Sequence, residues 1–283
     1  MKQHFKYFFT LFLVLSAFLT WRTVLSLENP TLKFYMLDIG QGDAIFIETP
    51  SGNQILVDGG PGKKVLSELG DVMPFFDRSI DAVFLTHPDL DHVGGLPEVL
   101  KNYDVDLYVD PGQPDTLGEY AEVERLVREK DIKRLVGRRG MKFLLDKDVV
   151  VEVLFPEKIA DGGNNNKNSL VLRLSYKNED FLMTGDAERP AEYFLFAKEN
   201  DLHSEVLKVG HHGSKSSTSD LFLENVRPSY AVISVGAKNT YGHPHEEVLN
   251  NLFDVGAKIL RTDVNSRVKI MTDGETLEVS SIK

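Results

Sequence analysis

Residues 86–95 carry four side chains that can bind metal, all within six positions: His87, Asp89, Asp91 and His92. Two carboxylates and two imidazoles this close together, with no lysine or arginine beside them, repel one another unless a cation neutralises them. Alternation along an extended loop turns His87, Asp89 and Asp91 to the same side, and the chain enters a helix at His92. The spacing therefore predicts that the four ligands converge on two adjacent cations. The alternative is a solvated Asp-rich turn, which fits the surrounding strand, loop and helix less well.

Two other strand ends deliver carboxylates. The apolar run 181–185 ends in Asp186, next to a glycine that permits close backbone approach. Asp186 is therefore a candidate bridging ligand between two metals. Asp58 follows the run 54–57, and it either supports a neighbouring ligand through hydrogen bonds or only forms a turn.

The loop 210–217 follows a further apolar strand and combines two imidazoles with a lysine, several hydroxyls and two glycines. His211, His212 and Lys215 at such a strand end predict a cradle for an oxyanion or a phosphate. The hydroxyls of 217–219 could also cap the next helix, and both roles can coexist.

The elements that must position these residues form two blocks, each a β-meander followed by alternating strands and helices. This order predicts an α/β (α+β) fold in which two sheets pack face to face with helices outside. Strands are expected at 32–39, 44–48, 54–57, 80–85, 106–109, 141–145, 149–155, 169–176, 181–186, 206–209, 230–235, 258–261, 268–272 and 276–280, and helices at 96–103, 117–130, 187–199, 220–225 and 246–253. Strand ends carrying polar side chains, at Asp58, His87, Asp186, His211 and His243, are expected to meet in one cleft.

Composition limits the partners. A net charge of −11 argues against general electrostatic adhesion to nucleic acid, although bound cations would reverse the field locally and allow a nucleic-acid substrate. The chain has no cysteine, which excludes disulfides and thiolate metal sites. Basic residues concentrate between 130 and 142, either along a polyanion or, more commonly, on a solvated strand face.

The N-terminal residues 1–27 are expected to be a signal peptide or a membrane anchor. The apolar run 7–21 is shorter than the roughly 20 residues that span a bilayer, so a cleaved leader, cut after Ser26, and an uncleaved anchor both fit. Lys2 and Lys6 favour an inside N-terminus. They would place the remaining domain, 32–283, outside the cytoplasm, secreted or anchored to the cytoplasmic membrane. A buried core helix is the weaker alternative.

Six ordered motifs carry a family resemblance: 38–44, 57–60, 86–95, 184–186, 208–214 and 241–245. From about Leu32 onward the chain resembles the metallo-β-lactamase-fold domain of ComEC-type DNA-internalisation competence proteins. The resemblance implies a four-layer αββα sandwich holding two divalent metal ions. It places metal ligands at His87, Asp89, Asp91, His92, Asp186 and His243. It also puts His211 and His212 where related phosphodiesterases hold a histidine that assists the leaving group.

Two departures from the family pattern matter. Asp89 stands where the superfamily usually has a second histidine, and the histidine expected before Ser169 is absent, with Asn168 the nearest polar residue. A more oxygen-rich site moves the expected ions from strict Zn²⁺ preference toward Mn²⁺ or Mg²⁺. Full competence proteins also carry a channel domain of many spans. This chain has room for one segment at most, so no DNA pore is expected.

The leading hypothesis is a two-metal phosphodiesterase, a nuclease that cleaves DNA outside the membrane. Asp91 would orient the attacking water, His211 or His212 would protonate the leaving group, and Lys215 would bind phosphate. Two alternatives stay open: hydrolysis of a small ester, lactone or amide at the same centre, and a membrane-tethered binding module without activity. The roles of Asp58, Asn168 and His245 are left open.

Overall fold

The computed structural model describes residues 2–26, 31–160, 162, 164–199 and 201–282. The chain divides into an N-terminal unit and a second unit that begins at Leu32. The first unit contains helix α1 (Lys2–Ser26), whose described apolar side chains are largely exposed. Across the described residues, no helix is both long and apolar enough to cross a membrane. The predicted end of the leader at Leu27 lies outside the described residues.

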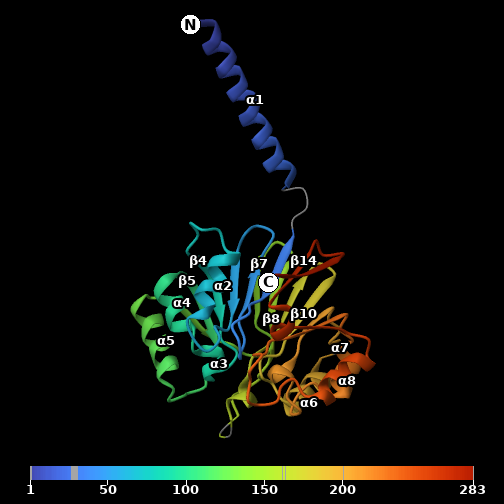
Figure 1. Ribbon diagram of the computed structural model, residues 1–283. Helices are drawn as coiled ribbons and strands as arrows, with labels where there is room; N and C mark the ends of the chain where they lie inside the picture. The colour runs from blue at the N-terminus through green and yellow to red at the C-terminus, as the bar shows by residue number, and fades with distance from the viewer. Residues whose placement is uncertain (1, 27–30, 161, 163, 200, 283) are drawn as a thin grey trace. The chain divides into compact units, whose positions relative to one another are not determined.

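The second unit is built on two sheets (Figure 1). The first has the strand order β15-β14-β1-β2-β3-β4-β5-β6. Its strands are β1 (Leu32–Met36), β2 (Ile45–Glu48), β3 (Gln54–Val57), β4 (Ser79–Phe84), β5 (Asp104–Asp110), β6 (Lys133–Val136), β14 (Arg267–Thr272) and β15 (Leu277–Ile282). From β3 to β6 the neighbouring strands run parallel, so their carboxyl ends share one edge.

The second sheet has the order β13-β12-β11-β10-β9-β8-β7. Its strands are β7 (Lys142–Asp146), β8 (Val149–Phe155), β9 (Val171–Tyr176), β10 (Glu179–Met183), β11 (Val206–Lys208), β12 (Tyr230–Ile233) and β13 (Lys258–Arg261). Strands β10 to β13 are parallel. Because strands buried on both faces read as continuous apolar runs, β2, β3 and β11 lack a clear alternation.

The main core lies between the two sheets. Phe34 of β1 stacks on Phe181 of β10 with ring centroids 5.2 Å apart, and Phe84 meets Phe143 edge to face at 5.2 Å. Burying such a side chain stabilises the fold by about 1.5–3 kcal/mol. These contacts join sheets from the two halves of the chain, and so they fix the spacing between the strand ends that carry the site.

Helices cover the outer face of each sheet. Over the first sheet lie α2 (Lys64–Val72), α3 (Leu90–Val93), α4 (Leu96–Asn102) and α5 (Gly118–Glu129), and over the second lie α6 (Arg189–Lys198), α7 (Asp220–Val226) and α8 (Glu246–Asp254). A short helix, α9 (Thr262–Asn265), and two 3₁₀ turns, η1 (Asn165–Asn168) and η2 (Gly210–Gly213), complete the elements. Apolar side chains fill both helix–sheet boundaries. The predicted four-layer αββα fold is confirmed.

Some predicted boundaries were wrong. The first strand ends at Met36 rather than Ile39, because the chain turns just after it, where the Ile39 amide donates to the Leu37 carbonyl at 3.1 Å. The helix expected from Ala187 begins at Arg189, with Pro190 in its first turn, where its missing N–H costs nothing. Helix α2 and strand β6 were not predicted.

Three of the six basic residues between 130 and 142 pair with carboxylates. Arg134 pairs with Asp110 at 2.7 Å, Arg139 with Glu199 at 2.7 Å and Lys142 with Glu152 at 3.5 Å. The fold thus neutralises these three charges, and we assign this region no role in binding a polyanion.

Candidate metal centre

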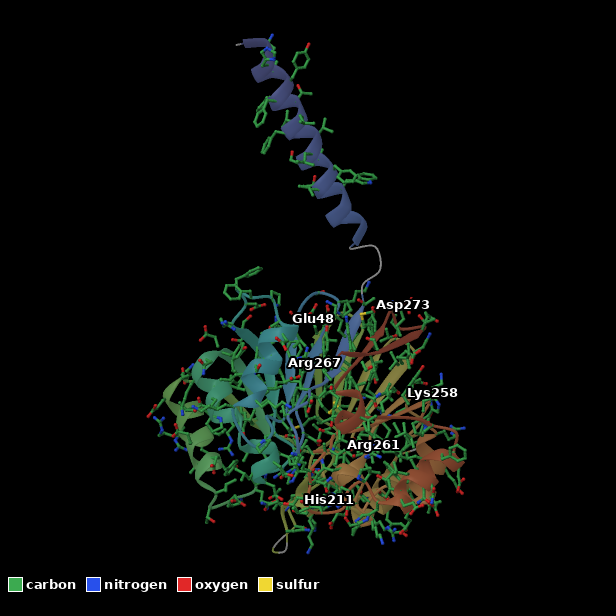
Figure 2. The ribbon with its side chains drawn as sticks, in the orientation of Figure 1. Glu48, His211, Lys258, Arg261, Arg267 and Asp273 are labelled. Carbon is green, nitrogen blue, oxygen red and sulfur yellow. The ribbon has the colours of Figure 1, made fainter. Side chains whose placement is uncertain are left out.

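The candidate site lies where the carboxyl ends of the parallel strands from both sheets meet. Figure 2 shows His211 at this end of the second unit, with Glu48 and Asp273 at the opposite end. The first sheet contributes His87 and His92 from the loop and short helix after β4. The second sheet contributes Asp186 from the loop after β10 and His212 from η2, which follows β11.

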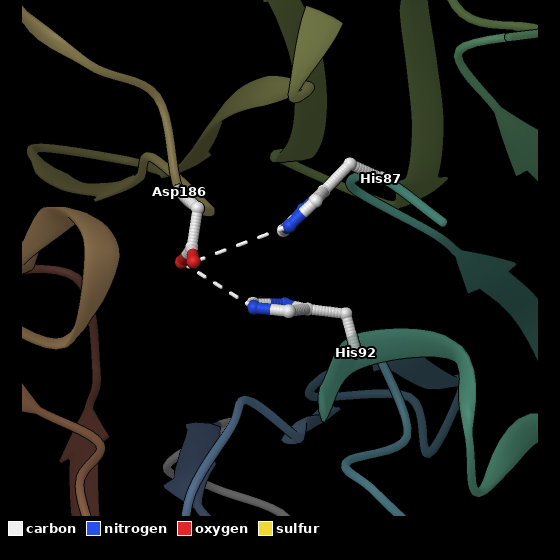
Figure 3. Close-up of side chains that lie close together, drawn as sticks. All are labelled: His87, His92 and Asp186. Atoms are coloured by element: carbon white, nitrogen blue, oxygen red, sulfur yellow. Dashed lines mark ion pairs between the residues drawn. The ribbon is translucent and has the colours of Figure 1, made fainter. Parts of the chain in front are cut away.

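His87, His92 and Asp186 form the centre of the site (Figure 3). The Nε2 atom of His92 is 3.4 Å from Asp186 Oδ1, and the Nε2 atom of His87 is 4.0 Å from Asp186 Oδ2. The two imidazole rings are 4.1 Å apart between centroids. All three side chains are buried, so the two sheets bring together residues about a hundred positions apart.

His212 joins the same centre and links it to Asp91. Its Nε2 atom is 3.4 Å from Asp91 Oδ2 and 3.5 Å from Asp186 Oδ2. Its Nδ1 atom is 2.9 Å from the carbonyl oxygen of Ser234. In the neutral ring Nδ1 therefore carries the proton, and the Nε2 lone pair faces the two carboxylates.

Backbone strain places the two neighbouring histidines of this loop. His211 and His212 have φ values of 47° and 54°, in the left-handed region that side chains other than glycine rarely adopt. Each such residue costs on the order of 1–3 kcal/mol and persists where the surrounding structure enforces it, often at functional sites.

Asp58 holds the histidines in place. One of its oxygens accepts from the Thr86 amide at 2.7 Å. The other accepts from the Thr86 hydroxyl at 2.7 Å and lies 2.8 Å from Nδ1 of His92. This contact leaves Nε2 of His92 free to point at Asp186. A carboxylate behind a histidine in this way fixes the ring and raises its basicity as a ligand, which is the supporting role considered for Asp58.

Asp43 and Lys208 form a buried ion pair next to Asp186, and neither was predicted as a site residue. The Lys208 ammonium also donates to the Gly185 carbonyl at 2.6 Å and lies 3.6 Å from Asp186 Oδ1. Asp43 Oδ1 lies 3.5 Å from Nδ1 of His212. A lysine inside a buried apolar strand was itself a signal, because a buried charge must find a partner.

A glycine brings Asp43 to the site. Gly42 has a φ of 112°, and a Cβ atom there would lie 2.0 Å from the carbonyl oxygen of Asp91. The same carbonyl accepts from the Asp43 amide at 3.0 Å. Only glycine allows the β1–β2 loop to approach the metal-binding loop this closely.

The electrostatics fit a cation. Burial lowers the pKa of His92, but the carboxylates of Asp186 and Asp58 outweigh it and hold that pKa well above its usual value. Burial raises the pKa of Asp186, yet His212 and His92 reverse this and hold it well below its usual value. The carboxylates thus stay ionised and attract positive charge to this point.

The donor atoms also fit a cation. Four buried atoms that face one another have no hydrogen-bond partner in the described part of the chain: Nε2 of His87, His92 and His212, and Oδ1 of Asp186. Leaving buried polar atoms unpaired is costly. Imidazole nitrogens together with carboxylate oxygens suit Zn²⁺ and Mn²⁺, and cations held in these overlapping groups would satisfy the four atoms.

Other predicted residues lie at the rim. Asp89 is 3.6 Å from His87 Nε2 and accepts from Asn165 at 2.6 Å, with 40% of its side chain exposed. His211 Nε2 is 3.7 Å from Asp186. Lys215 is exposed on the same loop.

His243 is outside the ligand groups found among the described residues. Its ring packs edge to face on His211 at 5.6 Å and on His245 at 5.1 Å. Burial, reinforced by His211 and His212, lowers the pKa of His243 to about 4, so its ring is neutral. The cluster thus includes His212, and His243 packs beside it against His211.

Asn168 does not replace the missing histidine. Its side chain holds the backbone of Ala160, accepting from the amide at 2.7 Å. Its neighbours reach the site instead: Asn165 donates to Asp89, and Asn166 Nδ2 is 3.4 Å from His211 Nδ1. Sequence alone could not choose among the four asparagines of 164–168.

With this geometry in hand, comparison with known proteins is direct. The model of a family described as the metallo-beta-lactamase superfamily matches residues 37–237. The chain belongs to the metallo-β-lactamase superfamily. Its fold is therefore that of metal-dependent hydrolases.

Two curated relatives of this superfamily member agree with the motif-based resemblance. ComE operon protein 3 of Bacillus subtilis (strain 168) is 34% identical over 251 residues, covering 83% of this chain and 32% of that protein. Competence protein ComA of Neisseria gonorrhoeae is 33% identical over 262 residues, covering 91% and 34%. The chain thus spans about a third of the length of these relatives. The predicted resemblance to competence proteins is confirmed.

A solved structure supports the superfamily fold independently. The metallo-beta-lactamase fold protein YhfI from Bacillus subtilis superimposes with a TM-score of 0.54 at 13% identity, covering 82% of this chain and 96% of YhfI. At that identity the likeness concerns the fold alone.

Proposed function

We propose that the protein is a phosphodiesterase that uses two divalent cations and cleaves DNA. The observation that carries the proposal is the convergence of His87, His92, His212 and Asp186 from two sheets, with their buried donor atoms unpartnered. The similarity to a protein named as a competence protein supports DNA as the substrate.

The candidate ligands form overlapping groups around Asp186. His87 and His92 group with Asp186, and His92 also groups with Asp91 and His212. His92 faces Asp186 Oδ1, whereas His87 and His212 face Oδ2. Both carboxylate oxygens thus reach the cluster, as a bridging carboxylate requires. Mn²⁺ or Zn²⁺ fits this donor set, and Mg²⁺ is compatible with its oxygen-rich side.

Divalent cations held here would lower the pKa of water and neutralise phosphoryl charge. The chain's own groups supply the rest. Asp91, whose side chain is 32% exposed, is placed to accept a proton from the attacking water and to orient it. His211, with 26% of its side chain exposed, is open to a substrate, whereas His212 at 2% is not.

His211 is therefore the proton donor in this proposal. Burial and the charge of His212 lower the pKa of His211, against the opposing effect of Asp186. Once protonated, a histidine with a lowered pKa is a stronger acid than an ordinary histidine, and it carries that proton mainly below neutral pH. Lys215, exposed on the same loop, would bind the phosphate.

The test is Mn²⁺-dependent cleavage of single-stranded DNA by His87→Ala and Asp186→Ala. Both should lose activity while keeping the fold. His203→Ala is the matched control. This histidine lies away from the centre, and its Nδ1 atom is 3.2 Å from the Glu205 carboxylate. Full activity in either site variant would end the proposal.

A small ester, lactone or amide is the second candidate substrate, and the net charge of −11 favours it. A panel of oligonucleotides, a bis-aryl phosphodiester and simple lactones with added Mn²⁺ separates the two classes. We also propose, from the apolar run 7–21, that the N-terminal segment is a leader or an anchor that places the hydrolase outside the cytoplasm. The accessibility of the second unit to an added protease in intact cells tests that placement.

A further inference from the structure

A pocket of about 260 Å³ opens next to the candidate metal centre. It lies between the end of β8, the turn η1 and the first turns of α6. Pockets for drug-sized ligands measure about 300–1,000 Å³, so this one suits a single small ring system. Its walls include Phe155, Lys167, Glu188, Pro190, Ala191 and Phe194.

Two aromatic rings dominate the pocket. Phe155 and Phe194 are both half-buried, and their rings meet edge to face with centroids 5.4 Å apart. Half-buried aromatic rings that border a pocket offer a stacking surface for another planar ring. Nucleobases use such surfaces with little regard to sequence, because every base has a π face.

The pocket and the candidate metal centre share two walls. Glu188 lines the pocket, and its carboxylate is 3.8 Å from Nδ1 of His211. The turn η1 forms the other wall. Its Asn166 side chain approaches His211, whereas Lys167 borders the pocket.

Asn168 completes this arrangement. Its amide group both accepts from and donates to the backbone of Ala160, at 2.7 Å and 3.2 Å. Ala160 itself lines the pocket. The turn η1 thus faces the metal centre through Asn165 and Asn166, and it shapes the pocket through Lys167 and Asn168.

The charges fit a base that is attached to phosphates. Glu188 is the acidic residue among those lining the pocket, and Lys167 is the basic one. Lys167 is exposed at the pocket, where an ammonium can reach a phosphate next to the bound base.

We propose that this pocket is a nucleobase subsite, which holds the base next to the scissile phosphate while Lys167 contacts the following phosphate. The inference rests on the proposed phosphodiesterase function and adds the pocket that positions the DNA strand.

The experiment compares the wild-type full chain with Phe194→Leu, which keeps an apolar side chain but removes the ring. The substrates are single-stranded oligonucleotides, each with one abasic residue at a successive position, and the cleavage at every linkage is mapped with Mn²⁺. Loss of stacking with one base should reduce wild-type cleavage at the linkage beside the abasic residue by about fivefold to a hundredfold. Phe194→Leu should cleave that linkage and the others nearly evenly.

Two further variants make the result specific. Phe253→Leu, at an exposed phenylalanine on α8, should keep the wild-type pattern. Lys167→Gln should weaken the binding of a labelled oligonucleotide, measured by fluorescence anisotropy in the presence of EDTA. The loss of affinity should be the same whether or not the oligonucleotide carries the abasic residue. The subsite would be overturned if Phe194→Leu still cleaved less beside the abasic residue, as the wild type does, or if the wild type cleaved all linkages equally. Either result would leave the proposed nuclease activity unaffected. A wild-type protein that neither binds nor cleaves the oligonucleotides overturns both.

Discussion

Replacing Asp58 with asparagine should weaken metal binding without removing a ligand. Asp58 receives two hydrogen bonds from Thr86 and contacts Nδ1 of His92 at 2.8 Å. An amide nitrogen in place of Oδ2 would point a donor at the Thr86 hydroxyl and at the imidazole. The His92 ring would lose the acceptor that holds its Nε2 atom toward Asp186.

Loss of a carboxylate behind a metal-binding histidine typically costs 10–100-fold in metal affinity. That factor corresponds to about 1.4–2.7 kcal/mol of binding free energy. We expect the Mn²⁺ dissociation constant of Asp58→Asn, measured by competition with a fluorescent chelator, to rise by this factor.

Asp77→Asn is the matched control. Asp77 accepts three hydrogen bonds, from the Ser79 amide and hydroxyl at 3.0 and 2.7 Å and from Gln54 at 2.6 Å. It lies just before β4, whereas the partners of Asp58 follow that strand. This variant should lose some stability and no metal affinity. Equal dissociation constants for Asp58→Asn and wild type, or an equal loss in Asp77→Asn, would refute the reasoning.

Three further results are expected. Lys208→Met strands Asp43 as an unpaired buried charge and should lower the free energy of unfolding in urea by about 3–5 kcal/mol, whereas Asp43→Asn combined with Lys208→Met should recover much of it; equal losses in the two would contradict the buried pair. Burial, together with Glu205 and Asp273, raises the pKa of Glu179 from 4.5 to about 7, so ionising this side chain opposes folding. The folded protein is therefore most stable, with respect to this group, below pH 4.5, where Glu179 is protonated, and it loses that stability as the pH rises through 7. Glu179→Gln should therefore be more stable than wild type at pH 8 by about 1–2 kcal/mol, and equally stable at pH 4, in thermal melts; a gain at both pH values would point to another cause. Mn²⁺ at 100 times its dissociation constant should stabilise the wild type by about 2.7 kcal/mol for each bound ion and leave the melting temperature of Asp186→Asn unchanged, which differential scanning calorimetry can check.

Much of this architecture was predictable from local pattern. Polar residues that interrupt apolar runs marked the strand ends at His87, Asp186 and His211, and parallel strands bring such ends to one edge. The αββα layers followed from the order of elements. Strand β6 was missed because its lysine and arginine side chains lie on a partly exposed edge strand, where the apolar signal is weak.

The composition of the site was less predictable, because it depends on contacts between the two halves of the chain. His212 enters the cluster through a left-handed backbone at η2 that no spacing reveals. Asp43 reaches the centre only through the close approach of Gly42 to the metal-binding loop. Lys208 interrupts an apolar strand and so signals a buried charge, but no local pattern identifies its partner Asp43, which lies 165 positions earlier.

Counting bound metal tests the proposed centre most directly. The full chain and its Asp186→Asn variant would be dialysed to equilibrium against Mn²⁺, and the ions per chain measured by elemental analysis, with His203→Ala as the control. We expect two ions per chain in the wild type and in the control, and no tightly bound ion in Asp186→Asn. A wild-type chain without stoichiometric metal, or an Asp186→Asn variant that keeps both ions, would contradict the shared cation centre.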